Sequence, residues 1–219
     1  MKNIEWNSRE FGCETVVNRR SHGLGVFFIF CFLIVIGSWR SEAQTLLTVG
    51  FEITPPSAQN FRTITEALNA VNTMEGKYEI WVKRGKYAED ELFVFGNVEM
   101  YGGFVGKEEK RSQRSTNAEF TILDGSLIHR IASVSGLIDG FRIENGREKG
   151  CGGGIRLLGG TIQNCIIQNN EAGEWGGGVY CEGYMNVVQN SVIRYNVCKQ
   201  DTTVIIGWWK GKGNSLRKL

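Results

Sequence analysis

The chain has 219 residues, including 29 glycines and 2 prolines, and its 25 basic and 23 acidic side chains leave a formal net charge of +2. Because these charges are balanced and form no clustered basic stripe, the composition argues against a nucleic-acid partner. Abundant glycine with scarce proline favours tight, repeated bends over a disordered linker.

Residues 1–43 are predicted to be a signal peptide. Arg19 and Arg20 precede an unbroken apolar run, Val26–Ile36, which is too short for a membrane span. Ser41 and Ala43 put small residues where a signal peptidase cuts, so we expect cleavage after Ala43; an uncleaved anchor is the alternative. Cleavage leaves 176 residues (219 − 43), enough for one domain with its own core and without a stable membrane span.

Residues 44–77 are predicted to hold an extended lead-in, Thr45–Pro56, and one helix. Four apolar residues recur at steps of three, four and three and therefore share one helix face: Phe61, Ile64, Leu68 and Val71. Thr63 and Glu66 have the spacing of a capping box, and Gly76 is a terminator.

From residue 78 to residue 125 the pattern changes to short strands. Tyr78–Val82 alternates as a strand, Lys83–Tyr87 has the composition of a turn, and Leu92–Phe95 is a second strand. Lys107–Asn117 is charged and has no apolar period, which predicts a loop that protrudes. Phe120–Gly125 is the next strand, ending in a glycine bend.

The stretch 138–196 contains one nine-residue pattern three times. The copies begin at Ile138, Ile162 and Val188. The third residues of the copies lie 24 and 26 residues apart (164 − 140 and 190 − 164), and they are Gly140, Asn164 and Asn190. A Gly-Gly-Gly signal before an apolar residue also recurs, at 152–154 and at 176–178. A period in the twenties predicts stacked repeats.

Within each copy the apolar residues are spaced by three and then by two. A step of two keeps both side chains on one face of a strand, whereas a step of three requires a corner. The corner residue is glycine or asparagine, the residues that tolerate positive φ. Gly140, Asn164 and Asn190 are therefore predicted structural bends, and the stacked asparagines are expected to form a hydrogen-bonded ladder.

These repeats predict an all-β fold, a parallel β-helix over residues 78–198. A leucine-rich repeat has a similar period, but its leucine pattern is absent. An antiparallel meander would need two-residue turns of the Asn-Gly type at short intervals.

The repeated segments resemble right-handed parallel β-helix proteins of the pectin-lyase-like superfamily, and in particular bacterial proteins with repeats like those of polymorphic outer-membrane proteins. The resemblance covers Val49–Val197. It implies a right-handed coil, an N-terminal capping α-helix, and a place outside the cell or on the outer-membrane surface of a bacterium. It implies no single activity, because the superfamily mixes polysaccharide lyases, hydrolases, adhesins and passenger domains.

Asp139, Arg142 and Glu144 are the candidates for catalysis. A lyase of this fold would need acidic residues for Ca²⁺ or for substrate charge, and calcium requires several oxygen ligands in one place. The equivalent positions of the later copies carry no acidic residue, so no acidic ladder forms. We therefore interpret these residues as a solvated face with a local ion pair, and we predict no cofactor and no metal; Ca²⁺ enters only under the lyase alternative.

Trp175, Tyr180 and Tyr184 lie near the second Gly-Gly-Gly run and are candidates for a carbohydrate-binding platform. The alternative is that Trp175 covers a corner of the coil. The basic residues of 83–86 and His129 are interpreted as solvated surface.

Four cysteines fall in the repeats, where an even number in an exported chain permits disulfides: Cys151, Cys165, Cys181 and Cys198. Cys165 occupies the repeat position of Phe141, which predicts a small buried thiol. The pairing of the four cysteines stays open.

Residues 199–219 depart from the pattern. A further rung would bring another Gly-Gly-Gly signal near residues 200–203, but the chain instead reads Val204–Trp209 and a basic end. We expect an irregular tail and a chain truncated from a longer coil. The alternative is that Val204–Trp209 forms one last strand.

The sequence therefore predicts a secreted or cell-surface β-helix scaffold or adhesin-like module with no evident catalytic site. The expected partner is a polysaccharide or a host or cell-surface glycan. The alternative is a polysaccharide lyase or glycoside hydrolase that acts on an acidic polysaccharide.

Overall fold

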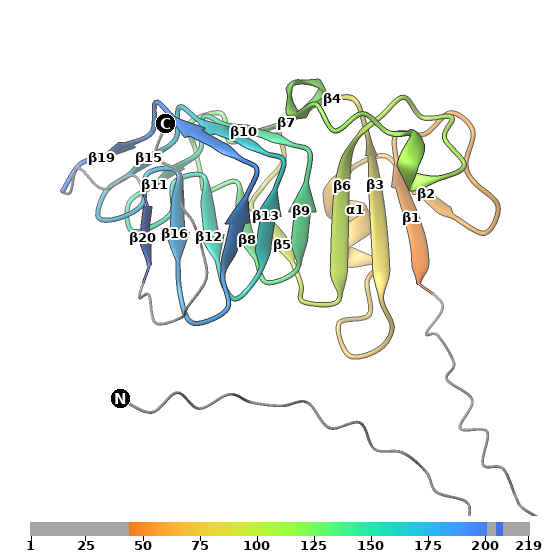
Figure 1. Cartoon of the computed structure of the whole chain (residues 1–219), viewed down its shortest axis with the longest axis horizontal. Helices are drawn as coiled ribbons and strands as arrows, with labels where there is room; N and C mark the ends of the chain where they lie inside the picture. The colour runs from red at the N-terminus through yellow and green to blue at the C-terminus, as the bar shows by residue number, and fades with distance from the viewer. Residues whose placement is uncertain (1–43, 201–204, 208–219) are drawn as a thin grey trace, which may run out of the picture. The chain divides into compact units, whose positions relative to one another are not determined.

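The computed structural model describes residues 44–200 and 205–207. Their strands stack side by side in four sheets, and the chain winds through these sheets in successive rungs (Figure 1). Every described strand pair is parallel, which confirms the predicted parallel β-helix and excludes the antiparallel meander. The predicted signal segment, 1–43, lies outside the described residues.

The four sheets are named A to D. Sheet A contains β1 (Thr45–Val49), β2 (Gln59–Phe61), β3 (Tyr78–Lys83), β6 (Val98–Phe104), β9 (Leu137–Asp139), β13 (Thr161–Gln163) and β17 (Val187–Gln189). Sheet B contains β4 (Gly85–Tyr87), β7 (Thr121–Asp124), β10 (Arg142–Glu144), β14 (Ile166–Gln168) and β18 (Val192–Arg194). Sheet C contains β5 (Leu92–Val94), β8 (Ala132–Val134), β12 (Ile155–Leu157), β16 (Val179–Cys181) and β20 (Ile205–Gly207). Sheet D contains β11 (Arg147–Glu148), β15 (Glu171–Ala172) and β19 (Val197–Cys198).

Each rung visits the sheets in a fixed order. The chain passes from A to B to C in the first rungs, and a short sheet D strand enters between B and C from β11 onward. The predicted repeats stack in register, so that Ile138 pairs with Ile162, and Ile162 with Val188. Equivalent side chains of successive rungs therefore form columns along the coil.

The inward columns form the hydrophobic core. The apolar residues of the first two copies are fully buried: Ile138, Phe141, Ile143, Ile162, Cys165 and Ile167. Val188 and Ile193 of the third copy are only partly buried and pack against the same core. The spacing of three and two in the sequence thus corresponds to inward residues on either side of a corner.

The corners have the backbone conformation that their residue types favour. Gly140, Asn164 and Asn190 have φ angles of 83°, 51° and 50° at the bend between sheets A and B. A second bend follows sheet B, where Asn145 and Asn169 have φ angles of 60° and 56°, and where the third copy places Tyr195 at 55°, an exception in residue type. Both bends lie in the left-handed region, which asparagine and glycine enter at the lowest cost.

The asparagine ladder forms at the second bend rather than at the first, where we predicted it. Asn170 is 1% exposed inside the coil, and its Nδ2 donates to Asn196 Oδ1 at 2.9 Å and to the Ile143 carbonyl at 3.1 Å. Asn164 instead donates to Asp139 Oδ1 at 2.8 Å. Because the side chain of Asn170 lies inside the coil, its amide meets the amide of the next rung.

The Gly-Gly-Gly runs lie directly against this ladder. A Cβ atom on Gly154 would come within 2.9 Å of Asn170 Cγ, and one on Gly178 within 2.8 Å of Asn196 Nδ2. Close approach therefore requires glycine at these positions, whereas positive φ requires it only at the first glycine of each run.

The one α-helix of the described chain, α1 (Ile64–Asn69), begins with the predicted capping box. Thr63 Oγ1 accepts from the Glu66 amide at 3.1 Å, and Glu66 Oε2 accepts from the Thr63 amide at 3.4 Å. The helix is shorter than predicted, because Phe61 belongs to β2. Ile64, Ala67 and Leu68 are buried in the main core, and their role in capping the coil stays a prediction.

Two segments that we predicted outside the strands belong to the sheets. Thr45–Val49, in the predicted lead-in, is β1 and pairs with β3. Gly85–Tyr87, in the predicted turn, is β4 and pairs with β7. Both strands are defined by pairing with a distant rung, which local sequence patterns do not reveal.

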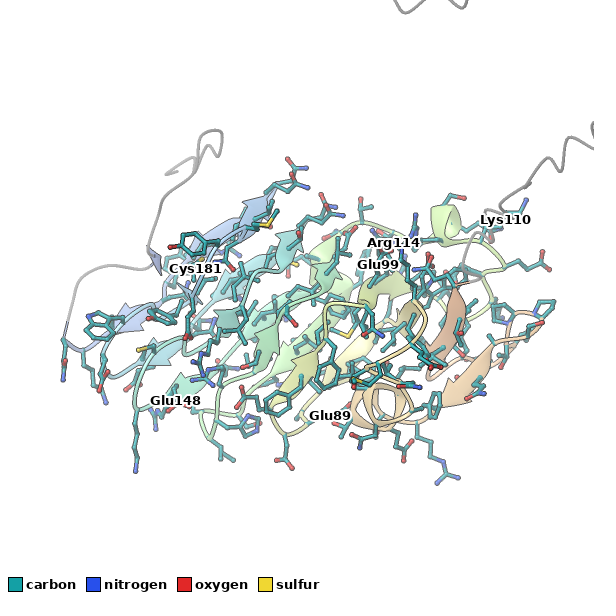
Figure 2. The ribbon with its side chains drawn as sticks, turned by 90° about the horizontal axis from the view of Figure 1, so that it is seen from below. Glu89, Glu99, Lys110, Arg114, Glu148 and Cys181 are labelled. Atoms are coloured by element: carbon teal, nitrogen blue, oxygen red, sulfur yellow. The ribbon has the colours of Figure 1, made fainter. Side chains whose placement is uncertain are left out.

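A second apolar cluster lies on the outer face of sheet A: Phe51, Trp81, Tyr101 and Phe104. The loop 107–117, which contains the 3₁₀ turn η1 (Arg111–Gln113), folds onto this cluster. The prediction that this loop protrudes is therefore wrong. The guanidinium groups of Arg111 and Arg114 lie 4.6 and 5.2 Å from the centre of the Tyr101 ring. Figure 2 places Arg114 on the same side of the coil as Glu99. A second 3₁₀ turn, η2 (Ala118–Phe120), leads into β7.

Near the C-terminus, β20 (Ile205–Gly207) pairs in parallel with β16, with Ile205 opposite Val179. A strand in this region was the alternative interpretation of Val204–Trp209. The residues on either side of β20 lie outside the described part of the chain.

Candidate functional site

The outer face of sheet C carries exposed apolar side chains from several rungs. One outward column of the stacked strands includes Phe93, Ser133, Arg156 and Tyr180. Phe93 is 54% exposed, and Phe95 and Leu158, which directly follow β5 and β12, are 38% and 39% exposed. Exposed large apolar side chains on several neighbouring rungs are typical of a contact surface.

The three predicted aromatic residues all belong to the rung of β16. Trp175 precedes the strand and is 43% exposed, Tyr180 lies within it, and Tyr184 follows it and is 74% exposed. The Trp175 carbonyl accepts from the Gly152 amide at 2.9 Å, which ties this turn to the preceding rung. The structure thus places one of the predicted platform residues in sheet C and the other two in the turns that flank its strand.

Polar groups lie between these apolar side chains. Arg156 Nε donates to Glu182 Oε2 at 2.7 Å, and the two side chains are 40% and 44% exposed. Burial raises the pKa of the neighbouring Tyr180 hydroxyl, with further contributions from Cys151 and Glu182. Tyr180 therefore keeps its proton and stays a hydrogen-bond donor through neutral pH.

Arg130 fixes the edge of this face. Its side chain is 12% exposed, and its donors reach Glu91 Oε1 at 3.0 Å, the Gly152 carbonyl at 3.0 Å and the Cys151 carbonyl at 2.9 Å. Ser133 Oγ also donates to Glu91 Oε1, at 2.6 Å. Since the Cys151–Gly152 backbone pairs with Trp175, Arg130 supports the turn that holds the tryptophan.

The three catalytic candidates do not form one cluster: Arg142 lies against Glu144, whereas Asp139 is engaged with other residues. Asp139 is 3% exposed rather than solvated, and its carboxylate lies 2.7 Å from Arg114 Nη2. Gln163 and Asn164 also donate to it, at 2.7 and 2.8 Å. The prediction that Asp139 is solvated is therefore wrong, because the loop 107–117 covers its side chain.

Arg142 and Glu144 lie on the outer face of sheet B, separated from Asp139 by the Gly140 bend. The Arg142 guanidinium pairs with Glu119, and its Nε lies 3.1 Å from Glu144 Oε2 without a hydrogen-bond alignment. Glu144 also accepts from Gln168 Nε2 at 2.9 Å. A local ion pair exists here, as predicted, but its partners are Glu119 and Glu144.

Two of the three basic residues of 83–86 pair with carboxylates, whereas Arg84 donates from Nε to the Gly103 carbonyl at 3.2 Å and lies over the Phe120 ring. Lys83 pairs with Glu52 at 2.7 Å, and Lys86 pairs with Asp124. Burial acts to raise the pKa of Asp124, but its hydrogen bonds, first among them the one with Lys86, outweigh burial and lower the pKa. His129 lies near this pair, with Nδ1 2.7 Å from the Arg130 carbonyl.

The four cysteines of the described chain are free thiols. Cys165 lies inside the coil, as predicted, and burial raises its pKa to about 12. Burial also raises the pKa of Cys181, to about 11, and that of Cys151. The thiols of Cys151, Cys165 and Cys181 therefore stay protonated at neutral pH.

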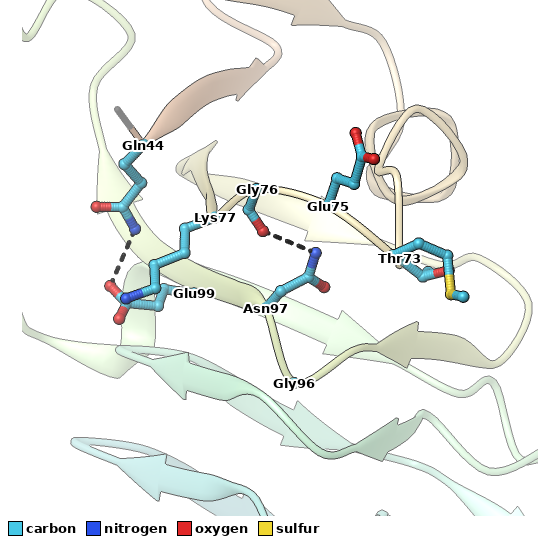
Figure 3. A pocket seen from close by; sticks show the side chains of 9 residues that line it. Gln44, Thr73, Glu75, Gly76, Lys77, Gly96, Asn97 and Glu99 are labelled. Atoms are coloured by element: carbon cyan, nitrogen blue, oxygen red, sulfur yellow. Dashed lines mark hydrogen bonds between the residues drawn. The ribbon is translucent and has the colours of Figure 1, made fainter. Parts of the chain in front are cut away.

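A hollow of about 860 Å³ lies at the opposite end of the coil from β16, between the start of β1, the loop after α1 and the turn before β6. Gln44 Nε2 donates to Glu99 Oε2 at 3.4 Å across it, and Asn97 Nδ2 donates to the Gly76 carbonyl at 3.1 Å (Figure 3). Its residues come from three separated segments without a shared motif, so no sequence pattern could have predicted it.

Within residues 44–200, no three His, Cys, Asp or Glu side chains are grouped so as to hold a metal ion. No helix of the described chain is long and apolar enough to cross a membrane. Comparisons with protein-family models, with curated proteins and with solved structures find no match to this chain. The stacked parallel sheets are therefore established by the structure, and the resemblance to the pectin-lyase-like superfamily stays a prediction.

Proposed function

We propose that this protein is an exported, non-catalytic β-helix scaffold that binds a glycan through the outer face of sheet C. A sugar ring presents apolar CH faces and a rim of hydroxyl groups. It is suited to a surface that combines exposed aromatic rings with fixed polar side chains. The face around β12 and β16 offers both kinds of group.

The observation that carries the proposal is the occurrence of Trp175, Tyr180 and Tyr184 within one rung, in β16 and in the turns on either side of it. Two of its members are exposed, at 43% and 74%, although aromatic rings of this size are usually buried in a core. The exposed Arg156–Glu182 pair lies beside Tyr180, because Arg156 stacks directly against it in sheet C.

The other outer faces carry fewer free binding groups. Sheet A is covered by the loop 107–117 at β3 and β6, and farther along it carries a ladder in which Gln189 donates to Gln163 and Gln163 to Asp139. Sheet D carries the ion pairs of Glu171 with Arg147 and Lys199. Sheet C therefore supports a binding role best.

Retention on a panel of insoluble polysaccharides tests the proposal. The double variant Trp175→Ala/Tyr184→Ala should lose about tenfold or more in affinity, the cost of removing two stacking rings. Tyr195→Ala is the matched control, because Tyr195 is also 74% exposed but lies at the bend after β18, away from sheet C. An equal loss in the control, or no retention of the unaltered chain on any polysaccharide, would refute the proposal.

The alternative, a lyase or hydrolase for acidic polysaccharide, would rest on Asp139, Arg142 and Glu144. These side chains are already engaged with other protein groups, which is why we favour the scaffold. Cleavage of polygalacturonate by the purified chain, abolished in Arg142→Ala, would overturn the non-catalytic part of the proposal.

A further inference from the structure

We infer that the glycan recognised by the sheet C face is uncharged, and that the Arg156–Glu182 pair is its polar anchor. This inference rests on the proposed function and adds the class of ligand. It comes from the balance of charges on the face and from the atoms of the pair that remain free.

Arg156 and Arg130, the cations that the described residues contribute to this face, each already face a carboxylate. Arg156 Nη2 lies 2.5 Å from Glu182 Oε2, and Arg130 Nη1 lies 3.0 Å from Glu91 Oε1. Glu148 adds a second carboxylate 3.4 Å from Arg130 Nη2. An anionic sugar would have to displace one of these carboxylates or approach it against like-charge repulsion, so the face disfavours uronates and sulfated sugars.

The Arg156–Glu182 pair nevertheless keeps hydrogen-bonding capacity. Its contacts use Arg156 Nε and Nη2 and a single oxygen of Glu182, Oε2. Arg156 Nη1 and Glu182 Oε1 make no bond to any other described residue, and both side chains are close to half exposed. The pair thus offers a further donor and a further acceptor, which suits sugar hydroxyls, since each hydroxyl both donates and accepts.

The apolar groups on both sides of the pair complete the arrangement. Arg156 lies between Tyr180 of the next rung and Ser133 of the preceding one, and beyond the serine comes Phe93. At about 4.8 Å per rung, the rings of Phe93 and Tyr180 are separated by roughly 14 Å along the coil. The anchor therefore lies between two aromatic residues of one column, where a short oligosaccharide reaches all three.

Hexasaccharides of two kinds test the inference. Cellohexaose and xylohexaose are the neutral probes, and hexagalacturonate is the anionic probe of the same length. Binding of each probe to the full chain is measured by calorimetry at about 0.05 M and at about 0.5 M salt. The higher concentration screens the attraction between exposed charges almost completely. We expect a neutral probe to bind with little salt dependence and the anionic probe to bind at least about tenfold more weakly.

Glu182→Gln separates a charge role from a merely structural one. It keeps the size of the side chain and removes the charge that neutralises Arg156, so affinity for hexagalacturonate should rise about three- to fivefold, the worth of one exposed ion pair. Thermal unfolding shows whether the variant is folded, and Glu171→Gln, which alters an ion pair on sheet D, is the matched control.

The outcomes distinguish the two proposals. If no probe and no other glycan binds, the proposed function fails and this inference fails with it. Preferred binding of hexagalacturonate with a steep salt dependence overturns the inference but leaves the glycan-binding function. If a neutral probe binds but Glu182→Gln gains no affinity for hexagalacturonate, the Arg156–Glu182 pair does not set the charge preference of the face, and the inference fails.

Discussion

Arg114 Nη2 lies 2.7 Å from Asp139 Oδ2, and the two side chains are only 7% and 4% exposed, although they are on the outer side of the coil. The docked loop 107–117 excludes water from this pair. Arg114 also donates to the Gly102 carbonyl at 3.0 Å, so its charge and its hydrogen bonds are satisfied together. This pair attaches the loop to the rung of β9.

Removing Arg114 should destabilise the protein strongly. Arg114→Ala leaves the buried Asp139 carboxylate without a counter-charge, which costs about 3 kcal/mol or more of unfolding free energy. Arg147→Ala breaks an ion pair whose arginine is 48% exposed, and it should cost less than about 1 kcal/mol. Urea unfolding of both variants measures the difference. Equal costs would mean that the Arg114 pair is solvated in solution.

The bend at Asn164 leads to a second prediction. Its φ of 51° lies in the left-handed region, where alanine is strained by about 1–2 kcal/mol. Asn164→Ala should therefore be less stable than Gln163→Ala, although both variants lose a hydrogen bond to Asp139. Asn164→Gly, which loses the same hydrogen bond but tolerates the φ angle, should recover part of the difference in melting temperature. Equal melting temperatures for the alanine and glycine variants would contradict the role of the bend.

The glycine runs allow a matched comparison. A Cβ at Gly154 would approach the Gly178 carbonyl oxygen at 2.5 Å and Asn170 Cγ at 2.9 Å, whereas one at Gly150 would meet nothing within 4 Å. Gly154→Ala should cost about 2 kcal/mol or more, as overpacking does. Gly150→Ala should be neutral or slightly stabilising, because it restricts the unfolded chain. Thermal unfolding distinguishes the two, and a harmless Gly154→Ala would refute the close packing of this corner.

Alkaline pH should destabilise the coil through its buried thiols. Burial raises the pKa of Cys165 to about 12, whereas a thiol in the unfolded chain titrates near pH 8.5. Its contribution to stability is complete below about pH 8.5 and decreases by about 1.4 kcal/mol per pH unit as the pH rises towards the folded pKa. We therefore compare the free energy of unfolding in urea at about pH 8.5 and at about pH 10. Over this range the Cys165→Ala variant should lose about 2 kcal/mol less of it than the unaltered chain does. Identical slopes would show that the thiol is not buried.

The repeated part of the fold was predictable because one physical requirement recurs at each rung. Inward apolar residues and left-handed corners are encoded within nine residues, and three copies made the pattern visible in the sequence. The first rungs lack such copies. β1 and β4 therefore became apparent only through their pairing with distant strands.

The candidate site was predictable only in part. Trp175, Tyr180 and Tyr184 are close in sequence and stay in one rung, so their grouping followed from the chain itself. Arg156 and Glu182 are brought together by the stacking of two rungs, and Arg114 reaches Asp139 from a loop without any period. Such pairs depend on loop conformation and on side-chain reach, which a repeat pattern does not encode.

The corner where Gly153 meets the Glu171 carbonyl and Gly154 meets Asn170 has a consequence for how this protein can change. A side chain larger than hydrogen at either glycine would collide with the backbone or the side-chain amide of the neighbouring turn. The cross-section of the coil is therefore fixed at this corner. The length is not fixed in this way, because each rung repeats the contacts of the one before it. Such a coil can grow by whole rungs and can vary in its outward loops, but it has no room to widen at this corner.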